Sequence, residues 1–184
     1  MHRDLETTIS IFSADDLARH AGELGALLHA CVHAGASIGF VLPFAASEAE
    51  AFWMRGVQPA LRNGGRLLLV ARRGDDIVGT VQLDYDTPPN QPHRAEVRKL
   101  MVSPDCRRQG IARVLMAELE RMAHGLKRSL LTLDTRTGDM AEPLYAALGY
   151  VTVGAIPGYA RDAAGPRLDA TTIMYKTLSG CGAE

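Results

Sequence analysis

The chain has 184 residues, a length that suits one domain and is enough to bury a substantial core. Its 20 Lys and Arg residues nearly balance its 21 Asp and Glu residues, which excludes the strongly basic surface of a nucleic-acid-binding protein. No stretch near the N-terminus has the order of a signal peptide, and no apolar run is long enough to span a bilayer. We therefore expect a cytoplasmic protein with no nucleic-acid or membrane partner.

The cysteines and histidines do not form a metal-binding pattern. Cys31, Cys106 and Cys181 are widely spaced and indicate neither a disulfide framework nor a zinc site. His29 and His33 share one face of a predicted helix, but no further ligand accompanies them. We therefore expect no metal and a reducing compartment.

The first third of the chain predicts one strand and two helices. Residues 8–12 alternate apolar and polar side chains, as a half-buried strand does, and 13–16 is close to a capping box. Leucines at helical spacing predict a helix over 17–32. The small residues of 35–39 have no periodic face and predict an irregular segment. A second helix is expected over 47–61, with its first serine as the N-cap.

The middle of the chain predicts a hairpin, a loop and a strand. Residues 66–72 and 76–84 flank Arg73-Gly74-Asp75, which is typical of a tight hairpin turn. Prolines and an asparagine in 87–92 predict a loop. Residues 94–102 then form an apolar segment that predicts a strand leading into the next turn.

Residues 107–112, a turn with two arginines and a glycine, join this strand to a long amphipathic helix. Backbone N–H groups without partners and the positive end of the helix dipole meet at such a turn. Gly110 lets the backbone approach an anion that a side chain would block. The turn therefore predicts a pyrophosphate site, its alternative being an ordinary turn on a basic surface. The basic residues near it in sequence, which suit a small polyanion, are Arg98, Lys99, Arg107, Arg108 and Arg113.

Beyond this turn the chain predicts further alternation of helices and strands. The helix has its apolar stripe at Ile111, Val114, Leu115, Leu119, Met122 and Leu126. Strands are expected at 130–134, 150–153 and 170–178, with a short helix after the first of them. Such alternation indicates a mixed α/β sheet. We expect one domain over 1–184, with a core of about 8–178 and a tail at 179–184.

The turn Arg107-Arg108-Gln109-Gly110-Ile111-Ala112 matches the pattern Q/R-x-x-G-x-G/A and so resembles the acetyl-CoA loop of the GNAT N-acetyltransferases. Leu131 to Asp134 and Ala141 to Tyr150 are similar to the second half of that family's domain. The resemblance implies acetyl-CoA as co-substrate. The residues that it implies for binding acetyl-CoA are Leu100, Met101, Val102, Arg107, Arg108, Gln109, Gly110, Ile111, Ala112 and Arg113.

Three further segments, 33–40, 94–102 and 156–159, resemble the tabtoxin-resistance acetyltransferases in particular, and the likeness extends over most of the chain. The resemblance implies a single-domain GNAT fold of the α/β class. Its central sheet is mixed and mostly antiparallel, and about four helices flank it. In that family the sheet is splayed in the middle, here between the strand ending at Val102 and the strand ending at Asp134. The pantetheine arm is implied to enter this gap.

Acyl transfer to an amine needs a neutral nucleophile, and therefore a base within reach. Glu96 and Asp134 are the candidates, because each is a carboxylate on a strand that borders the implied gap, and the resemblance points to the same pair. Alternatively, Asp134 caps a turn and Glu96 pairs with Arg94 or Arg98. Tyr145 resembles the tyrosine that GNAT enzymes place near the coenzyme sulfur, where a phenol of pKa near 10 can protonate the leaving thiolate. Its alternative role is a core aromatic.

We expect the acetyl group to go to a primary amine of a small amino-acid-like acceptor, a β-lactam toxin such as tabtoxinine being one case. The alternatives are a protein or peptide Nα-acetyltransferase and a non-catalytic acetyl-CoA-binding regulatory module. The sequence is also compatible with a homodimer, which we keep as an alternative to a monomer. The residues expected on the acceptor side are His33, Ser37, Phe40, Asn90 and Tyr159.

Overall fold

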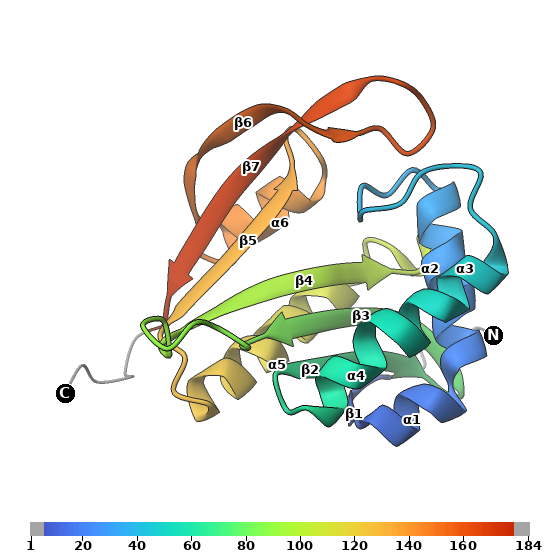
Figure 1. Cartoon of the computed structure of the whole chain (residues 1–184), viewed down its shortest axis with the longest axis horizontal. Helices are drawn as coiled ribbons and strands as arrows, with labels where there is room; N and C mark the ends of the chain where they lie inside the picture. The colour runs from blue at the N-terminus through green and yellow to red at the C-terminus, as the bar shows by residue number, and fades with distance from the viewer. Residues whose placement is uncertain (1–5, 179–184) are drawn as a thin grey trace.

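A computed structural model describes residues 6–178 of the chain (Figure 1). Seven strands within these residues form one sheet in the order β1-β2-β3-β4-β5-β7-β6. Neighbouring strands run antiparallel except β4 and β5, which pair in parallel, so the sheet is of the mixed, mostly antiparallel kind that was expected. The strands are β1 (Thr7–Phe12), β2 (Arg66–Arg73), β3 (Asp76–Asp84), β4 (Arg94–Val102), β5 (Leu130–Arg136), β6 (Val151–Arg161) and β7 (Leu168–Thr177).

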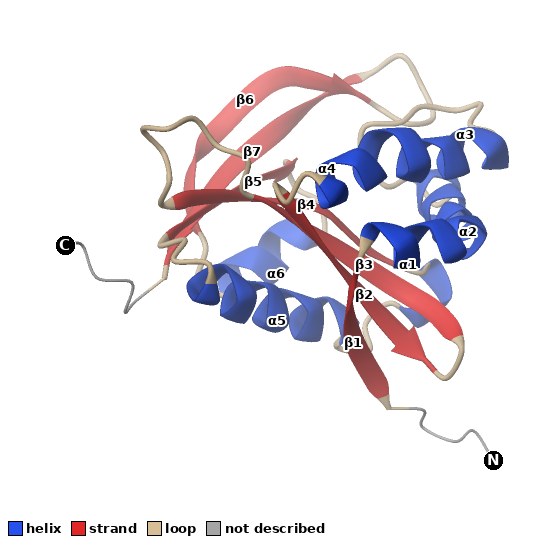
Figure 2. Cartoon of the chain, turned by 60° about the horizontal axis from the view of Figure 1, so that its bottom comes forward, coloured by secondary structure: helices blue, strands red, loops and turns tan. Residues whose placement is uncertain are grey.

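Helices cover both faces of the first four strands (Figure 2). Helices α1 to α4 lie on one face, whereas α5 and α6 lie on the other. The helices are α1 (Ala14–Arg19), α2 (Ala21–His33), α3 (Ala46–Ala51), α4 (Gln58–Arg62), α5 (Ile111–Gly125) and α6 (Ala141–Ala147), with a π-helical segment η1 (Phe52–Val57) and a 3-10 turn η2 (Pro104–Cys106).

Strand β2 shows how the core is divided between the two faces. Leu68 and Val70 pack with the cluster under α1 to α4, whereas Leu69 and Ala71 pack with the cluster under α5. All four are fully buried. Because successive side chains of a strand point to opposite faces, a strand buried on both sides is apolar throughout. This part of the sheet is therefore stabilised by apolar packing on both of its faces.

Helix α5 packs on the sheet through the predicted apolar stripe. Ile111, Leu115 and Leu119 are buried, four residues apart along one face. Val114, also expected on the stripe, is 45% exposed, because it lies at the edge of that face. The packing fixes the N-terminus of α5 against the end of β4.

Strands β4 and β5 are paired only at their beginnings. Their parallel register ends where Glu96 lies opposite Thr132. Beyond that point β4 continues to Val102 beside β3, while β5 continues to Arg136 beside β7, and the two diverge (Figure 1). The expected splay of the sheet between these two strands is confirmed.

The N-terminal helical region differs from the expectation at one point and agrees at another. The helix predicted over 17–32 is interrupted at His20, which ends α1 and precedes α2. The capping box is present: the N–H of Asp16 donates to Ser13 Oγ at 3.1 Å, and the N–H of Ser13 donates to the Asp16 carboxylate at 2.9 Å.

Two predicted boundaries are wrong. The helix expected to start at Ser47 starts after Ala45, because the Ala45 N–H donates to the Glu48 carboxylate at 2.8 Å and is satisfied there without a serine cap. The strand expected over 150–153 extends to Arg161 as β6, because β7 offers a hydrogen-bonding partner along that length, with two register shifts.

Within residues 6–178, no helix is long and apolar enough to cross a membrane. In the same part of the chain, no group of three or more His, Cys, Asp or Glu side chains is placed to hold a metal ion. Cys31 and Cys106 are free thiols. Cys181 and the expected tail at 179–184 lie outside the described residues.

Candidate active site

A cavity of about 690 Å³ occupies the fork between β4 and β5. Residues 96–102 of β4 all line it, and so do 134–136 of β5. The turn before α5 also lines it, as do 34–39, after α2, and 169–171 of β7, on the side where the acceptor is expected. Because β5 does not pair with β4 beyond Glu96, the backbone N–H and C=O groups on that edge of β4 are available to hydrogen-bond a ligand in the fork.

The N-terminus of α5 has the features of an anion site. Gly110 is its N-cap, has a φ of +82° and provides no side-chain cap for the first-turn N–H groups. A Cβ built on Gly110 meets no atom within 4 Å, so the backbone is open on that side. Arg107 and Arg108 line the cavity and form no ion pair with any carboxylate of residues 6–178. An anion at this turn meets unused donors and two guanidinium groups.

The predicted cofactor residues do not all face this cavity. Leu100, Met101, Val102, Arg107, Arg108, Gly110, Ile111, Ala112 and Arg113 line it. The Gln109 side chain does not, because its amide oxygen accepts a hydrogen bond from Arg73 on the neighbouring hairpin.

A thiol lies close to the open edge of β4. Cys31 on α2 lines the cavity, and its Sγ donates to the Val102 carbonyl at 3.5 Å. Burial raises the pKa of this thiol, while Arg107 beside it acts in the opposite direction. The thiol therefore stays protonated at neutral pH.

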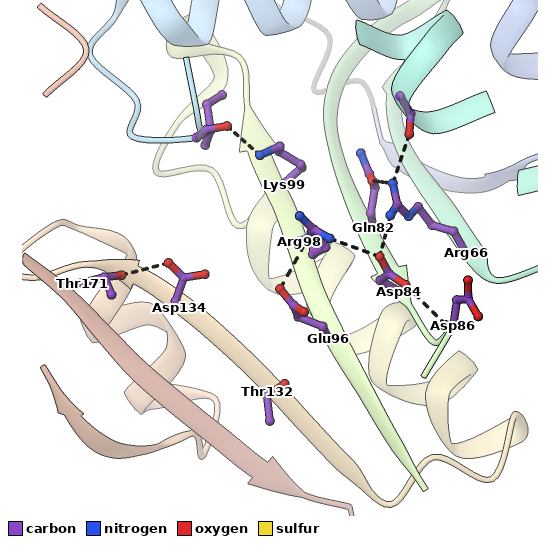
Figure 3. Close-up of polar contacts among 12 residues, drawn as sticks. Arg66, Gln82, Asp84, Asp86, Glu96, Arg98, Lys99, Thr132, Asp134 and Thr171 are labelled. Atoms are coloured by element: carbon purple, nitrogen blue, oxygen red, sulfur yellow. Dashed lines mark hydrogen bonds and ion pairs between the residues drawn. The ribbon is translucent and has the colours of Figure 1, made fainter. Parts of the chain in front are cut away.

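The two carboxylates expected to act as base both line the cavity. Glu96 stands where the strands separate, and Asp134 stands on β5 two residues beyond Thr132 (Figure 3). Asp134 accepts a hydrogen bond from Thr171 Oγ1 at 2.9 Å, which orients its carboxylate. It does not cap a turn, so that alternative is wrong.

A chain of ion pairs leads from inside the sheet to Glu96 (Figure 3). Arg66 lies 2.5 Å from Asp84, which lies 3.3 Å from Arg98, which in turn lies 3.8 Å from Glu96. The alternative that Glu96 pairs with Arg98 is therefore realised, although loosely. The Glu96 side chain is 40% exposed and remains able to contact a ligand.

Tyr145 of α6 lines the cavity and is 6% exposed, with its ring 5.7 Å from that of Tyr150. It is thus both a core aromatic and a cavity residue. Burial raises the pKa of its phenol far above the usual range, and the carboxylates of Asp134 and Asp139 raise it further. This removes the expected match between the pKa of the phenol and that of a thiol. A phenol of this kind keeps its proton and donates a hydrogen bond.

The residues expected on the acceptor side separate into two groups. Ser37 and Tyr159 line the cavity. His33 does not; its Nδ1 contacts the carbonyl of His29 within its own helix, at 2.9 Å. Asn90 is exposed in the loop before β4, whereas the cavity opens toward the far end of that strand.

Phe40, the fifth of these residues, does not line the cavity but packs behind residues that do. Its ring contacts Phe44 and Phe52, with centroids 4.7 and 5.2 Å away. It also stands beside Lys99, a cavity residue that the sequence grouped with the phosphate turn. The backbone of Lys99 has a φ of +52°, which no local sequence signal indicates.

The loop after α2 and the β6–β7 hairpin, two segments near the expected acceptor residues, are joined by a backbone contact. The N–H of Leu42, in the loop after α2, donates to the carbonyl of Ala163, in the β6–β7 hairpin, at 2.7 Å. Ala163 is buried by this approach. The contact ties the loop after α2 to the β6–β7 hairpin, although neither Leu42 nor Ala163 lines the cavity itself.

Comparisons with known proteins agree with this geometry. The model of the acetyltransferase (GNAT) family matches residues 26–150, more than half of the chain. A ribosomal-protein-alanine N-acetyltransferase from Brucella melitensis is similar in structure, with a TM-score of 0.74, 22% identity, and coverage of 93% of this chain and 99% of that one.

Two further solved structures show the same fold. A ribosomal-protein-S5-alanine acetyltransferase from Vibrio fischeri has a TM-score of 0.78 at 14% identity, covering 100% of this chain and 98% of that one. The Salmonella typhimurium protein yncA, solved with acetyl-CoA, has a TM-score of 0.76 at 17% identity, covering 97% and 98%. With the family model matching across the fork and the α5 turn, the chain belongs to the GNAT family of acetyltransferases.

Proposed function

We propose that this protein transfers an acetyl group from acetyl-CoA to the primary amine of a small amino-acid-like molecule, with β-lactam toxins such as tabtoxinine within that class. The observation that carries the proposal is the α5 turn: an open glycine N-cap and two arginines that form no ion pair with a carboxylate of residues 6–178, all lining a forked cavity. That combination fits a diphosphate.

In this proposal the rest of acetyl-CoA lies in the same cavity. Arg107, Arg108 and the first turn of α5 hold the diphosphate, and the unpaired edge of β4 at Met101 and Val102 hydrogen-bonds the pantetheine arm; both segments line the cavity. Acetyl-CoA supplies a thioester whose carbon–sulfur bond is exchanged for a carbon–nitrogen bond. The chain must therefore hold the amine beside it and accept its proton.

Glu96 and Asp134 provide the proton acceptor. An amine of pKa about 10.4 is neutral in only about one molecule in 2,500 at pH 7, which corresponds to ~4.6 kcal/mol. A carboxylate in the cavity first binds the ammonium and then takes its proton, directly or through a water. Holding both reactants in the fork contributes further, since positioning can be worth about 7–11 kcal/mol.

Tyr145 assists departure of the coenzyme A thiolate. Its phenol stays protonated because burial and two carboxylates oppose ionisation. It can therefore stabilise negative charge by hydrogen-bond donation throughout the neutral pH range.

The small acceptor is favoured by the bridge from Leu42 to Ala163. A peptide acceptor needs an open groove in which the chain beyond its N-terminal residue can leave the site. The bridge ties together two segments that both contribute residues to the cavity, which opposes their separation to admit a longer chain. The ribosomal-protein acceptors in the names of two structural neighbours are not transferred to this chain, since those proteins are 22% and 14% identical to it.

The coenzyme part is tested by calorimetric titration with acetyl-CoA. Gly110→Glu should raise the Kd at least about tenfold, because it adds strain at positive φ and a negative charge beside the diphosphate. Gly64→Glu is the matched control, because Gly64 also has a positive φ, +74°, and open space at its Cβ but lies away from the cavity. Equal affinities of the two variants would contradict the assignment.

The acceptor part is tested by thiol release with amino acids, polyamines, aminoglycosides and short peptides. Turnover of amino acids supports the proposal. Turnover of peptides alone indicates an Nα-acetyltransferase, and binding of acetyl-CoA without turnover of any amine indicates a regulatory module.

A further inference from the structure

Lys99 is a cation in the cavity that the chemistry above does not use. Its side chain extends from β4 toward the loop after α2, where Nζ donates to the Ile38 carbonyl at 2.6 Å (Figure 3). The ring centroids of Phe40 and Phe52 lie 5.7 and 5.9 Å from Nζ. An ammonium has three donors, so these contacts fix its position and leave donors for a ligand.

The backbone is deformed in a way that directs this side chain. Lys99 and Leu100 together lie opposite the single residue Val81, which makes a bulge in β4. The backbone of Lys99 has a φ of +52°, a conformation that residues other than glycine rarely adopt. Such strain is kept where the surroundings enforce it, often at functional sites. The absence of a side chain at Gly39 leaves room, since a Cβ there would lie 3.3 Å from Nζ.

The other cations lining the acceptor half of the cavity are paired. Arg98 contacts two carboxylates and Arg136 contacts three. Lys99 forms no ion pair with a carboxylate anywhere in residues 6–178. Burial and Arg98 lower the pKa of its ammonium, while the charges of Asp134 and Glu96 act in the opposite direction. A partly buried cation of this kind gains most from an anion brought by a ligand.

We propose that Lys99 binds the carboxylate of the acceptor, so that the acceptor is an amino carboxylate such as a free amino acid. The inference rests on the proposed function, because Glu96 and Asp134 must hold the amine of the same molecule. The carboxylates of Glu96 and Asp134, together with the Lys99 ammonium, complement the two charges of a zwitterion. A simple amine, an amino-acid amide or a peptide leaves Lys99 without its anion.

The test compares each amino acid that is acetylated with its own carboxamide, for example L-methionine with L-methioninamide and L-alanine with L-alaninamide. The wild-type kcat/KM should favour the acid. In Lys99→Met, kcat/KM for the acid should fall by about 10–100-fold, the effect of one charged hydrogen-bonded pair. The amide should change by less than about threefold, and Lys99→Arg should retain most of the preference for the acid, because it retains the charge.

Lys127→Met is the matched control. Lys127 is another lysine with a positive φ, +57°, but it is exposed after α5 and does not line the cavity. This variant should leave the preference unchanged. Calorimetric titration of the same acid and amide into the CoA-bound protein gives an independent measure of the preference.

The outcomes separate the inference from the proposed function. If acid and amide lose kcat/KM equally in Lys99→Met, Lys99 only fastens the loop after α2, and the inference is wrong. It is also wrong if the wild type prefers amides, peptides or simple amines while acetyl-CoA still binds. If acetyl-CoA does not bind at all, the proposed function fails, and the inference fails with it.

Discussion

The two halves of the sheet differ on either side of the fork. Strands β1 to β4 have helices on both faces and buried side chains pointing both ways (Figure 2). In the other half α6 packs behind β5, and in β6 every residue except Ala160 is exposed. The first half therefore gains its stability from a double-sided core, and the second presents an uncovered face to the cavity.

The contrast determines where a charged side chain can lie with little desolvation penalty. Asp134 lies on the uncovered side and is exposed, so its charge does not have to be removed from water. Lys99 lies in the covered half, where its ammonium needs a carbonyl and two aromatic rings around it. Substitutions of buried residues in the first half should therefore affect stability, whereas substitutions on the exposed face of the second half should affect it little.

The largest effect is expected at the two carboxylates. Glu96→Gln and Asp134→Asn should each lower kcat by about 100-fold or more, since a positioned base typically contributes about 10²–10⁴-fold. Because both side chains are partly or fully exposed, the free energy of unfolding should change by no more than about 0.5 kcal/mol. Thiol-release kinetics and denaturant unfolding measure the two quantities.

The control for this pair is Asp75→Asn, an exposed carboxylate in the β2–β3 turn. It should change neither quantity. If both cavity variants retain wild-type kcat, neither carboxylate is the base. A large loss of stability in Asp134→Asn would contradict the contrast between the two halves.

A pair of glycines tests the contrast directly. In the covered half, a Cβ on Gly79 would lie 2.9 Å from the Met101 carbonyl and 3.2 Å from both Ile111 and Leu115. Gly79→Ala should therefore lower the free energy of unfolding by about 1–2 kcal/mol, as overpacking does. In the uncovered half, Gly154→Ala should change it by less than about 0.5 kcal/mol, because nothing lies within 4 Å of that Cβ. Equal effects in denaturant titrations would mean that the two halves are packed alike.

The same division explains what the sequence could predict. The open turn at 107–112, predicted to bind an anion, depends on consecutive residues and on backbone geometry that a strand–turn–helix order dictates, so a contiguous pattern is enough to predict its shape. The placement of Glu96 and Asp134 at one gap is what the family resemblance implies, and both side chains line the cavity. The alternation of β2 between two cores likewise follows from its unbroken apolar run.

The acceptor end could not be predicted because it depends on contacts distant in sequence. The direction of Lys99 results from its pairing against Val81 of another strand. The bridge between Leu42 and Ala163 joins a loop to a hairpin from the other end of the chain. His33 was expected in the cavity because it is polar and precedes a small-residue segment, but its ring contacts its own helix.

The smallest expected effect concerns Tyr145, at the boundary between the halves. Burial raises the pKa of its phenol far above 10, so in the folded protein it should stay protonated through the ordinary tyrosine range near pH 10. Ultraviolet titrations of folded wild type and Tyr145→Phe should then coincide up to that pH. In denaturant, where the chain's five tyrosines ionise near pH 10, the wild type should show one phenolate more.

The same shift has a consequence for stability whose sign is fixed. Above about pH 10 the unfolded chain loses the Tyr145 proton before the folded protein does, so ionisation favours unfolding. The free energy of unfolding of the wild type should therefore fall more steeply with pH above that point than that of Tyr145→Phe. Parallel slopes, or a phenolate signal from Tyr145 in the folded protein near pH 10, would mean that the uncovered half admits water to the phenol. Tyr145 could then give up its proton to the leaving thiolate rather than only donate a hydrogen bond.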